Sequence, residues 1–244
     1  MSPAAWPVVL SLPHGGLEAP AEVTTAWVVA VGQVRAEADL GTAEIFGDLP
    51  ALAVVQARHS RLVVDLNRRA DDASEGGVIP LVTYPDKREI YQPGRRPDPR
   101  QRQERLNAFY WPYHHQLQAA LRLSGVQGLL DCHSMDPLNP DGSPRPQVCL
   151  GDCRGQTCGG ELLLRLQAAL VEQGFQVACQ EPYSGGHITR HYGGDLFARG
   201  LFAAQVELNK ALFLRPGETA LDLERLAAVR RRVAAALDVF CAGL

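Results

Sequence analysis

The chain carries the stretch Gly128-Leu129-Leu130-Asp131-Cys132-His133-Ser134-Met135, a short apolar run that ends in groups able to bind metal or move protons. In an α/β protein, such a run is typical of a buried parallel strand whose carboxyl end opens onto a site. His133 is therefore the first candidate for a functional residue. Asp131 precedes it by two positions, so on a strand it shares the face of His133 and could act as a ligand or as a partner of an imidazole.

Three other apolar runs, residues 6–12, 61–66 and 201–206, are also followed or accompanied by polar side chains. We expect all four runs to be strands whose carboxyl ends lie at one edge of a sheet. That edge would collect the polar residues His14, Asn67, Arg68, His133 and Glu207. Together they would form a metallohydrolase site.

Helical patterns alternate with these strands along the chain. We expect helices over residues 31–49 with a break near Gly41-Thr42, over 103–123 with Pro112 as a kink or start, over 160–174 and over 221–240. Residues 51–57 and 175–179 are expected to form further strands. This order predicts an α/β three-layer sandwich, with a mostly parallel central sheet, helices on both faces and room for one antiparallel edge.

The bulk composition sets the broad class of the protein. With 244 residues, 46% of them hydrophobic, the chain can bury one large core, so we expect a single domain over residues 1–244. A net charge of -3 gives no basic footprint for nucleic acid. No basic segment precedes an apolar stretch at the amino terminus, and no run of 18 apolar residues occurs, so we expect a cytoplasmic protein without membrane segments. The oligomeric state is left open.

Several other features have structural interpretations. Cys149, Cys153 and Cys158 lack a CxxC pair, which favours ordinary loop thiols over a second zinc site. Adjacent His114 and His115 cannot bind one ion from the same helix face, so a packing or surface role is favoured. Residues 69–105 have little periodicity and are expected to form a loop that covers a substrate. Residues 184–194 are expected to form a flexible, donor-rich loop.

A catalytic zinc ion typically takes three protein ligands from His and carboxylate side chains and leaves one position for water. His14 and His133 are expected to supply two of them. The third should be a carboxylate, and the candidates are Glu18, Glu37, Asp39 and Asp131.

Glu207 lies in Gln205-Val206-Glu207-Leu208-Asn209, where alternation places the three polar side chains on one face. We expect it to be the general base, with its pKa raised by partly apolar surroundings. The alternative is a surface glutamate on an edge strand. Arg68 and Arg190 are candidates for binding an acidic substrate, because a guanidinium group pairs with a carboxylate through two hydrogen bonds.

Taken together, these pieces resemble the N-formylglutamate amidohydrolases, zinc enzymes whose core is similar to that of the zinc carboxypeptidases and zinc-dependent muramoyl amidases. Six pieces run in the family's order over nearly the whole chain. They are Leu12-Pro13-His14-Gly15-Gly16, Glu37-Ala38-Asp39, residues 61–68, Asp131-Cys132-His133-Ser134, residues 185–193 and residues 205–209.

The resemblance implies a zinc site formed by His14, His133 and an acidic residue between them in sequence. We choose Asp39 for the third ligand, because the family usually has an acidic residue before the helix at that place, and we keep Glu37 in reserve. The chain departs from the family at position 37, which is Glu where a second Asp is common. The resemblance implies Glu207 as the general base. It also implies Arg68 and Arg190 around the substrate's carboxylates, with His187 and Asn67 adding hydrogen bonds to the substrate or oxyanion.

The expected reaction is hydrolysis of the amide of a small acidic N-acyl amino acid, with N-formyl-L-glutamate and water giving L-glutamate and formate. One alternative is the same fold and metal acting on another N-acyl amino acid or on a peptide amide. A cell-wall peptide is disfavoured because no export signal is visible. Alternatives from other classes are a non-catalytic binder of an acidic metabolite and a structural or interaction protein, which leave Glu207 and the polar strand ends without a role.

Overall fold

The structure is a computed structural model that describes residues 5–215, 217 and 219–244. Within these residues, six strands form one mixed sheet in the order β2-β1-β3-β6-β4-β5. Their bounds are β1 Trp6–Leu12, β2 Ala51–Gln56, β3 Gly128–Met135, β4 Val148–Gly151, β5 Val177–Cys179 and β6 Phe202–Asn209. The first four strands in that order are parallel, and β4 pairs with β6 in the antiparallel sense, so β4 and β5 form an antiparallel edge.

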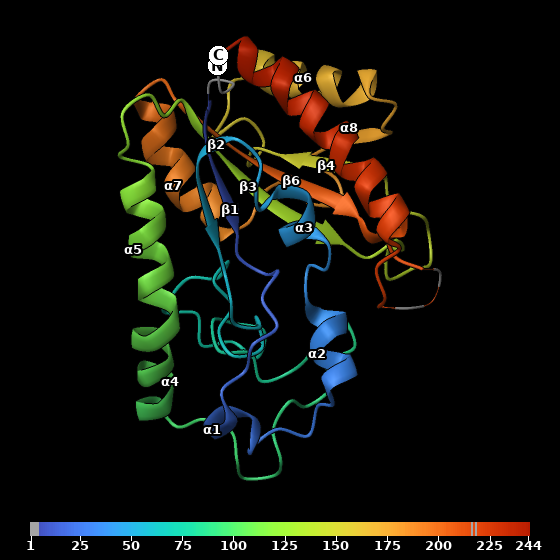
Figure 1. Cartoon of the computed structure of the whole chain (residues 1–244). Helices are drawn as coiled ribbons and strands as arrows, with labels where there is room; N and C mark the ends of the chain where they lie inside the picture. Colours follow the sequence, from blue (N-terminus) through green and yellow to red (C-terminus); the bar gives the residue numbers. More distant parts are fainter. Residues whose placement is uncertain (1–4, 216, 218) are drawn as a thin grey trace.

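Helices cover both faces of the sheet, as Figure 1 shows. One face packs against α3, α6 and α8, and the other packs against α5 and α7. The bounds of these helices are α3 Thr42–Phe46, α5 Trp111–Ala120, α6 Gly160–Glu172, α7 His187–Ala198 and α8 Leu223–Ala242. The predicted three-layer α/β sandwich is confirmed. In the described part of the chain, no helix combines the length and the apolar character needed to cross a membrane.

The inner strands explain why the apolar runs were visible in the sequence. Every residue of β3 and β6 is buried, because helices cover both faces of these strands. Near-continuous apolar sequence is what such a position requires. Gly128 begins β3 where the ring of Phe202 in β6 leaves no room for a side chain.

A cover of loops and short helices lies beyond the carboxyl ends of the strands (Figure 1). It contains α1 Ala21–Thr24, α2 Val31–Glu37 and most of residues 61–98, and it has a small apolar core of its own. The predicted break after α2 is confirmed, since Gly41 adopts the left-handed conformation (φ 85°) immediately before α3. The helix predicted over residues 103–123 is also present. It continues from α4 Pro99–Arg105 through a short π-helix, Leu106–Tyr110, into α5.

Two local predictions were wrong. Residues 61–66 form a turn instead of a strand, with the amide of Val63 donating to the carbonyl of Ser60. Leu62 and Val63 are apolar because they pack in the cover, and burial alone does not distinguish a loop from a strand. Residues 187–194 belong to α7 instead of a flexible loop. Gly193 is needed there because a side chain would collide with Thr157 and Ala203.

Candidate active site

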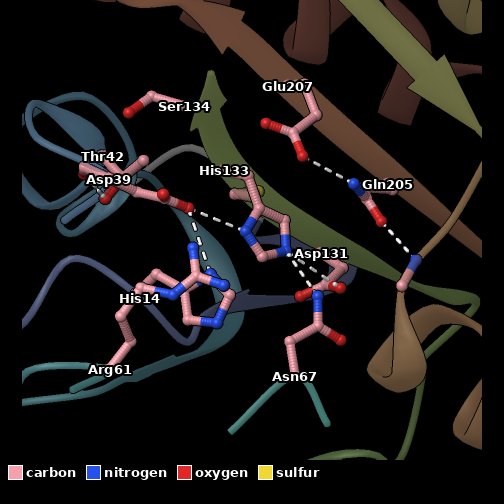
Figure 2. Close-up of polar contacts among 12 residues, drawn as sticks. His14, Asp39, Thr42, Arg61, Asn67, Asp131, His133, Ser134, Gln205 and Glu207 are labelled. Carbon is pink, nitrogen blue, oxygen red and sulfur yellow. Dashed lines mark hydrogen bonds and ion pairs between the residues drawn. The ribbon is translucent and has the colours of Figure 1, made fainter. Parts of the chain in front are cut away.

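Three neighbouring strands bring the principal candidate residues together. β1, β3 and β6 are parallel, so their carboxyl ends lie at the same edge of the sheet. His14 follows β1 by two residues, and His133 of β3 lies directly opposite Glu207 of β6 in the register of the sheet. All three side chains are buried. Figure 2 shows them around a common space with Asp39.

Asp39 reaches this space from the turn between α2 and α3. Its amide donates to the carbonyl of His14 over 3.0 Å, and its own carbonyl accepts from the hydroxyl of Thr42. One carboxylate oxygen of Asp39 lies 2.8 Å from Nδ1 of His133 and 3.5 Å from Nδ1 of His14. One ligand atom from each of these three residues lies within 4.8 Å of the others, so they could hold a metal ion.

The outer nitrogens of both imidazoles contact buried carboxylates. Nε2 of His14 lies 2.8 Å from Asp65, and Nε2 of His133 lies 3.2 Å from Asp131. A carboxylate on one nitrogen orients an imidazole so that the other nitrogen faces a metal ion. The two imidazoles therefore present Nδ1 toward Asp39, and the donor set of two nitrogens and one carboxylate fits a divalent transition metal.

Asp65 is held in place from three sides. One oxygen accepts from the amide of Asn67 and contacts His14, and the other accepts from the guanidinium of Arg61 over 2.6 Å. Burial alone would raise the pKa of Asp65, but the charges of Arg61 and His14 outweigh it and hold this pKa well below its ordinary value. Asp65 is therefore an anion that orients His14.

Asp131 has an equivalent position beside His133. Its two oxygens accept from the hydroxyls of Ser11 (2.9 Å) and Thr189 (3.2 Å), so both are engaged. Burial lowers the pKa of His133, but the charge and hydrogen bonds of Asp131 and a hydrogen bond with Asp39 raise it well above its ordinary value. Two buried carboxylates, Asp131 and Asp39, therefore flank the imidazole of His133.

Asp39 itself is ionised. Burial raises its pKa, whereas hydrogen bonds from His133 and His14 lower it more strongly, and the resulting pKa lies well below the ordinary value. Glu37, the reserve candidate for the third ligand, turns its carboxylate to the amide of Tyr84. The structure thus places Asp39, and not Glu37, between the two histidines.

Glu207 lies beside the three candidate ligands on an inner strand instead of an edge strand. One of its oxygens accepts from Nε2 of Gln205 over 2.7 Å. Burial raises the pKa of Glu207 to about 7, with His133 opposing this rise and Asp39 adding to it. A carboxyl group with a pKa near neutrality can both accept and return a proton, as a general base must.

His14, Asp39, His133 and Glu207 line a cavity of about 420 Å³. Asn67 and Arg68 also line it, as do four residues that the sequence patterns did not single out as site residues, namely Arg61, Arg145, Tyr183 and Lys210. Arg61 pairs with Asp65 and Lys210 with Asp136. Within residues 5–215, 217 and 219–244, neither Arg68 nor Arg145 forms an ion pair, so both can meet a bound anion.

The family model for the N-formylglutamate amidohydrolases matches residues 6–214 of this chain. The chain belongs to the N-formylglutamate amidohydrolase family. The match runs from β1 to beyond β6 and therefore includes every residue of the cavity described above.

Individual members of this family are similar to the chain in sequence and in structure. The chain is 31% identical to an N-formylglutamate deformylase from Pseudomonas putida, over 91% of this chain and 86% of the relative. It is 30% identical to one from Pseudomonas aeruginosa, over 85% and 82%. A crystal structure of an N-formylglutamate amidohydrolase from Ralstonia eutropha JMP134 superposes with a TM-score of 0.82 at 25% identity, covering 98% of this chain and 94% of that one.

Two of the residues expected to bind substrate lie elsewhere. His187 and Arg190 are on α7, and they line a separate cavity of about 650 Å³ together with His114 and Tyr192. Arg190 is exposed. His114 has the predicted packing role, because its two nitrogens contact the hydroxyl of Tyr192 and the carbonyl of Leu66.

Asn67 lines the same cavity as His14, Asp39 and His133, and the oxygen of its amide is already engaged. Its oxygen accepts from the amide of Ile188 over 2.7 Å, and its nitrogen lies 3.2 Å from Nε2 of His133. These contacts give Asn67 a place beside His133. The oxygen of the Asn67 amide is thus committed to the start of α7, whereas its NH2 group lies beside His133 at the cavity.

Replacing Asp65 with asparagine is expected to weaken metal binding by about 10- to 100-fold, as loss of an outer carboxylate partner typically does. The reason is that His14 would lose the anion that fixes its ring. Competition with a chromophoric chelator measures this affinity, and Asp71→Asn, at an exposed position paired with Arg69, is the matched control. An affinity for Asp65→Asn equal to that of the control would contradict the role given to Asp65.

Proposed function

We propose that this protein is a zinc-dependent amidohydrolase that converts N-formyl-L-glutamate and water to L-glutamate and formate. The observation that carries the proposal is the joint placement of His14, Asp39 and His133 beside Glu207, in a cavity where Arg68 and Arg145 form no ion pair with any described residue. The named relatives act on N-formylglutamate, and their similarity to this chain over most of its length supports the same substrate.

We assign His14, Asp39 and His133 as the residues that would hold zinc. Two imidazole nitrogens and one carboxylate oxygen are a common ligand set of catalytic zinc, which leaves a further position open. When bound, zinc supplies Lewis-acid polarisation of a carbonyl group and lowers the pKa of water to about 7. Asp65 and Asp131 fix the two imidazoles, so the ligand geometry is set before the ion arrives.

Glu207 is assigned as the general base. It removes a proton from the attacking water while the water oxygen bonds to the formyl carbon, and it then gives that proton to the leaving nitrogen as the C–N bond breaks. Its raised pKa suits both steps, and its position opposite His133 in the sheet, in the same cavity as Asp39, supports this assignment. Formate and the amino group of glutamate result.

Arg68 and Arg145 are assigned to the two carboxylates of the substrate. Arg145 donates from Nε to Asn139 and from one terminal nitrogen to the carbonyl of Asp136, and its guanidinium lies 5.3 Å from the ring of Tyr183. These contacts hold the guanidinium, and its other terminal nitrogen has no partner in the described part of the chain. A held guanidinium recognises a carboxylate at little further entropic cost.

Replacing Arg145 with alanine is expected to raise KM for N-formyl-L-glutamate by about 10- to 100-fold, the equivalent of one or two charge-assisted hydrogen bonds. The effect on kcat should be smaller, because Arg145 binds a part of the substrate that does not react. Steady-state kinetics measure both constants. Arg122→Ala, at an exposed position after α5, is the control. An unchanged KM would remove Arg145 from substrate recognition.

A substrate panel tests the proposed function. N-formyl-L-glutamate is compared with N-acetyl-L-glutamate, which changes the acyl group, and with N-formyl-L-glutamine and N-formyl-L-norleucine, which lack the second carboxylate. We expect the highest kcat/KM for N-formyl-L-glutamate. A preference for the neutral N-formyl amino acids would contradict recognition of two carboxylates by Arg68 and Arg145. A preference for the acetyl compound would contradict the formyl specificity.

A further inference from the structure

The first turn of α7 is held by side chains that are distant in sequence. Its N-cap residue, Gly186, has no side chain to accept from the free amides at the start of the helix. Instead, the amide of Gly186 donates to Oε1 of Gln205 in β6, and the amide of Ile188 donates to Oδ1 of Asn67. Both accepting side chains also line the cavity of the proposed active site.

These contacts fix which way the amide of Gln205 points. Its oxygen accepts from Gly186, so its NH2 group faces Glu207, with Nε2 lying 2.7 Å from one carboxylate oxygen. The reverse orientation would place the amide oxygen against a carboxylate and the NH2 group against an N–H donor, and both contacts would be repulsive. Figure 2 shows this chain of contacts from Glu207 through Gln205 to the backbone.

We infer that Gln205 is a positioning residue for the reaction, which holds one oxygen of Glu207 so that the other oxygen serves as the base. This inference rests on the proposed function. The second oxygen of Glu207 has no hydrogen-bond partner among the described residues, and Glu207 lines the cavity. A glutamate side chain has three rotatable bonds, so the hydrogen bond from Gln205 removes freedom that would otherwise be lost when the water is activated.

Two variants of Gln205 separate its two contacts. Gln205→Ala removes both contacts, whereas Gln205→Glu keeps an acceptor for Gly186 and replaces the donor to Glu207 with an oxygen. We expect both variants to bind one zinc ion and to keep KM for N-formyl-L-glutamate within about twofold, while kcat falls by about 10- to 100-fold. The control is Gln147→Ala, because Gln147 also accepts from a backbone amide, that of Gln176, but does not contact Glu207.

A double variant shows whether Gln205 acts through Glu207. When Glu207 is already glutamine, the additional change of Gln205 to alanine should lower kcat by no more than about twofold, because the base to be positioned is absent. If the fold losses in kcat of Glu207→Gln and Gln205→Ala multiply in the double variant, Gln205 acts independently of Glu207 and the inference is overturned. Wild-type kcat in both single variants of Gln205 would also overturn it.

The outcomes for the inference and for the proposed function are distinguishable. A zinc-loaded wild-type protein that releases no formate overturns the proposed function, and the inference with it. An active wild-type protein whose Gln205 variants lose zinc, or change in KM instead of kcat, overturns only the inference, because Gln205 would then support folding or binding and not Glu207.

Discussion

Replacing Glu207 with glutamine is expected to lower kcat for N-formyl-L-glutamate by about 10²- to 10⁴-fold, the usual contribution of a general base. Glutamine has almost the same shape as glutamate and can still contact Gln205, but it cannot take a proton from water. Metal content should remain that of the wild-type protein, because Glu207 is not among the three converging ligand residues.

One further measurement and one control variant accompany Glu207→Gln. Metal stoichiometry by atomic emission separates loss of the base from loss of the ion, and Glu172→Gln, at an exposed position in α6, is the control for the substitution itself. A Glu207→Gln protein with the kcat of the wild type would remove Glu207 from the mechanism. A protein that has lost its metal would instead make Glu207 part of the metal site.

The second large effect is expected from Asp39→Asn. Loss of an outer carboxylate partner such as Asp65 weakens metal binding by about 10- to 100-fold, and Asp39→Asn should weaken it by more than that, with a matching fall in activity. Among the described residues, Asp39 supplies the only carboxylate of the three candidate ligand residues. Asparagine keeps the size of the side chain but removes the negative charge that lies 2.8 Å from Nδ1 of His133.

Glu37→Gln is the matched control for Asp39→Asn. Glu37 lies two residues earlier and lines the same cavity, but its carboxylate accepts from the amide of Tyr84. Isothermal titration of each protein with zinc, after chelation and dialysis, measures the affinities. If Glu37→Gln lost the metal and Asp39→Asn retained it, the assignment of the third ligand would be reversed.

The parts of the fold that follow from burial were predictable from sequence. β1, β3 and β6 are inner strands with both faces covered, so they are apolar until the point where His14, His133 and Glu207 reach the site. The same logic failed for residues 61–66, which are buried in the cover as a turn. It also failed for α7, whose Gly193-Gly194 pair resembles a loop, although Gly193 is required there by close packing against Thr157 and Ala203.

The parts of the site that depend on distant contacts were harder to predict. Arg145 and Tyr183 are placed by irregular segments, where no periodicity marks which side chains turn toward the cavity. The pairing of Asp65 with His14 joins residues 51 positions apart, and spacing alone cannot reveal such a pair. Asp65 does lie in the segment 61–68 that resembles the family, and that resemblance was the one signal available for it.

We propose that this chain hydrolyses N-formyl-L-glutamate with a metal held by His14, Asp39 and His133. The most direct test measures formate and glutamate released by the purified protein before chelation, after chelation, and after zinc is restored. We predict that activity is lost with the metal and returns with stoichiometric zinc. Activity that persists after complete removal of metal, or no formate from the zinc-loaded protein, would contradict the claim.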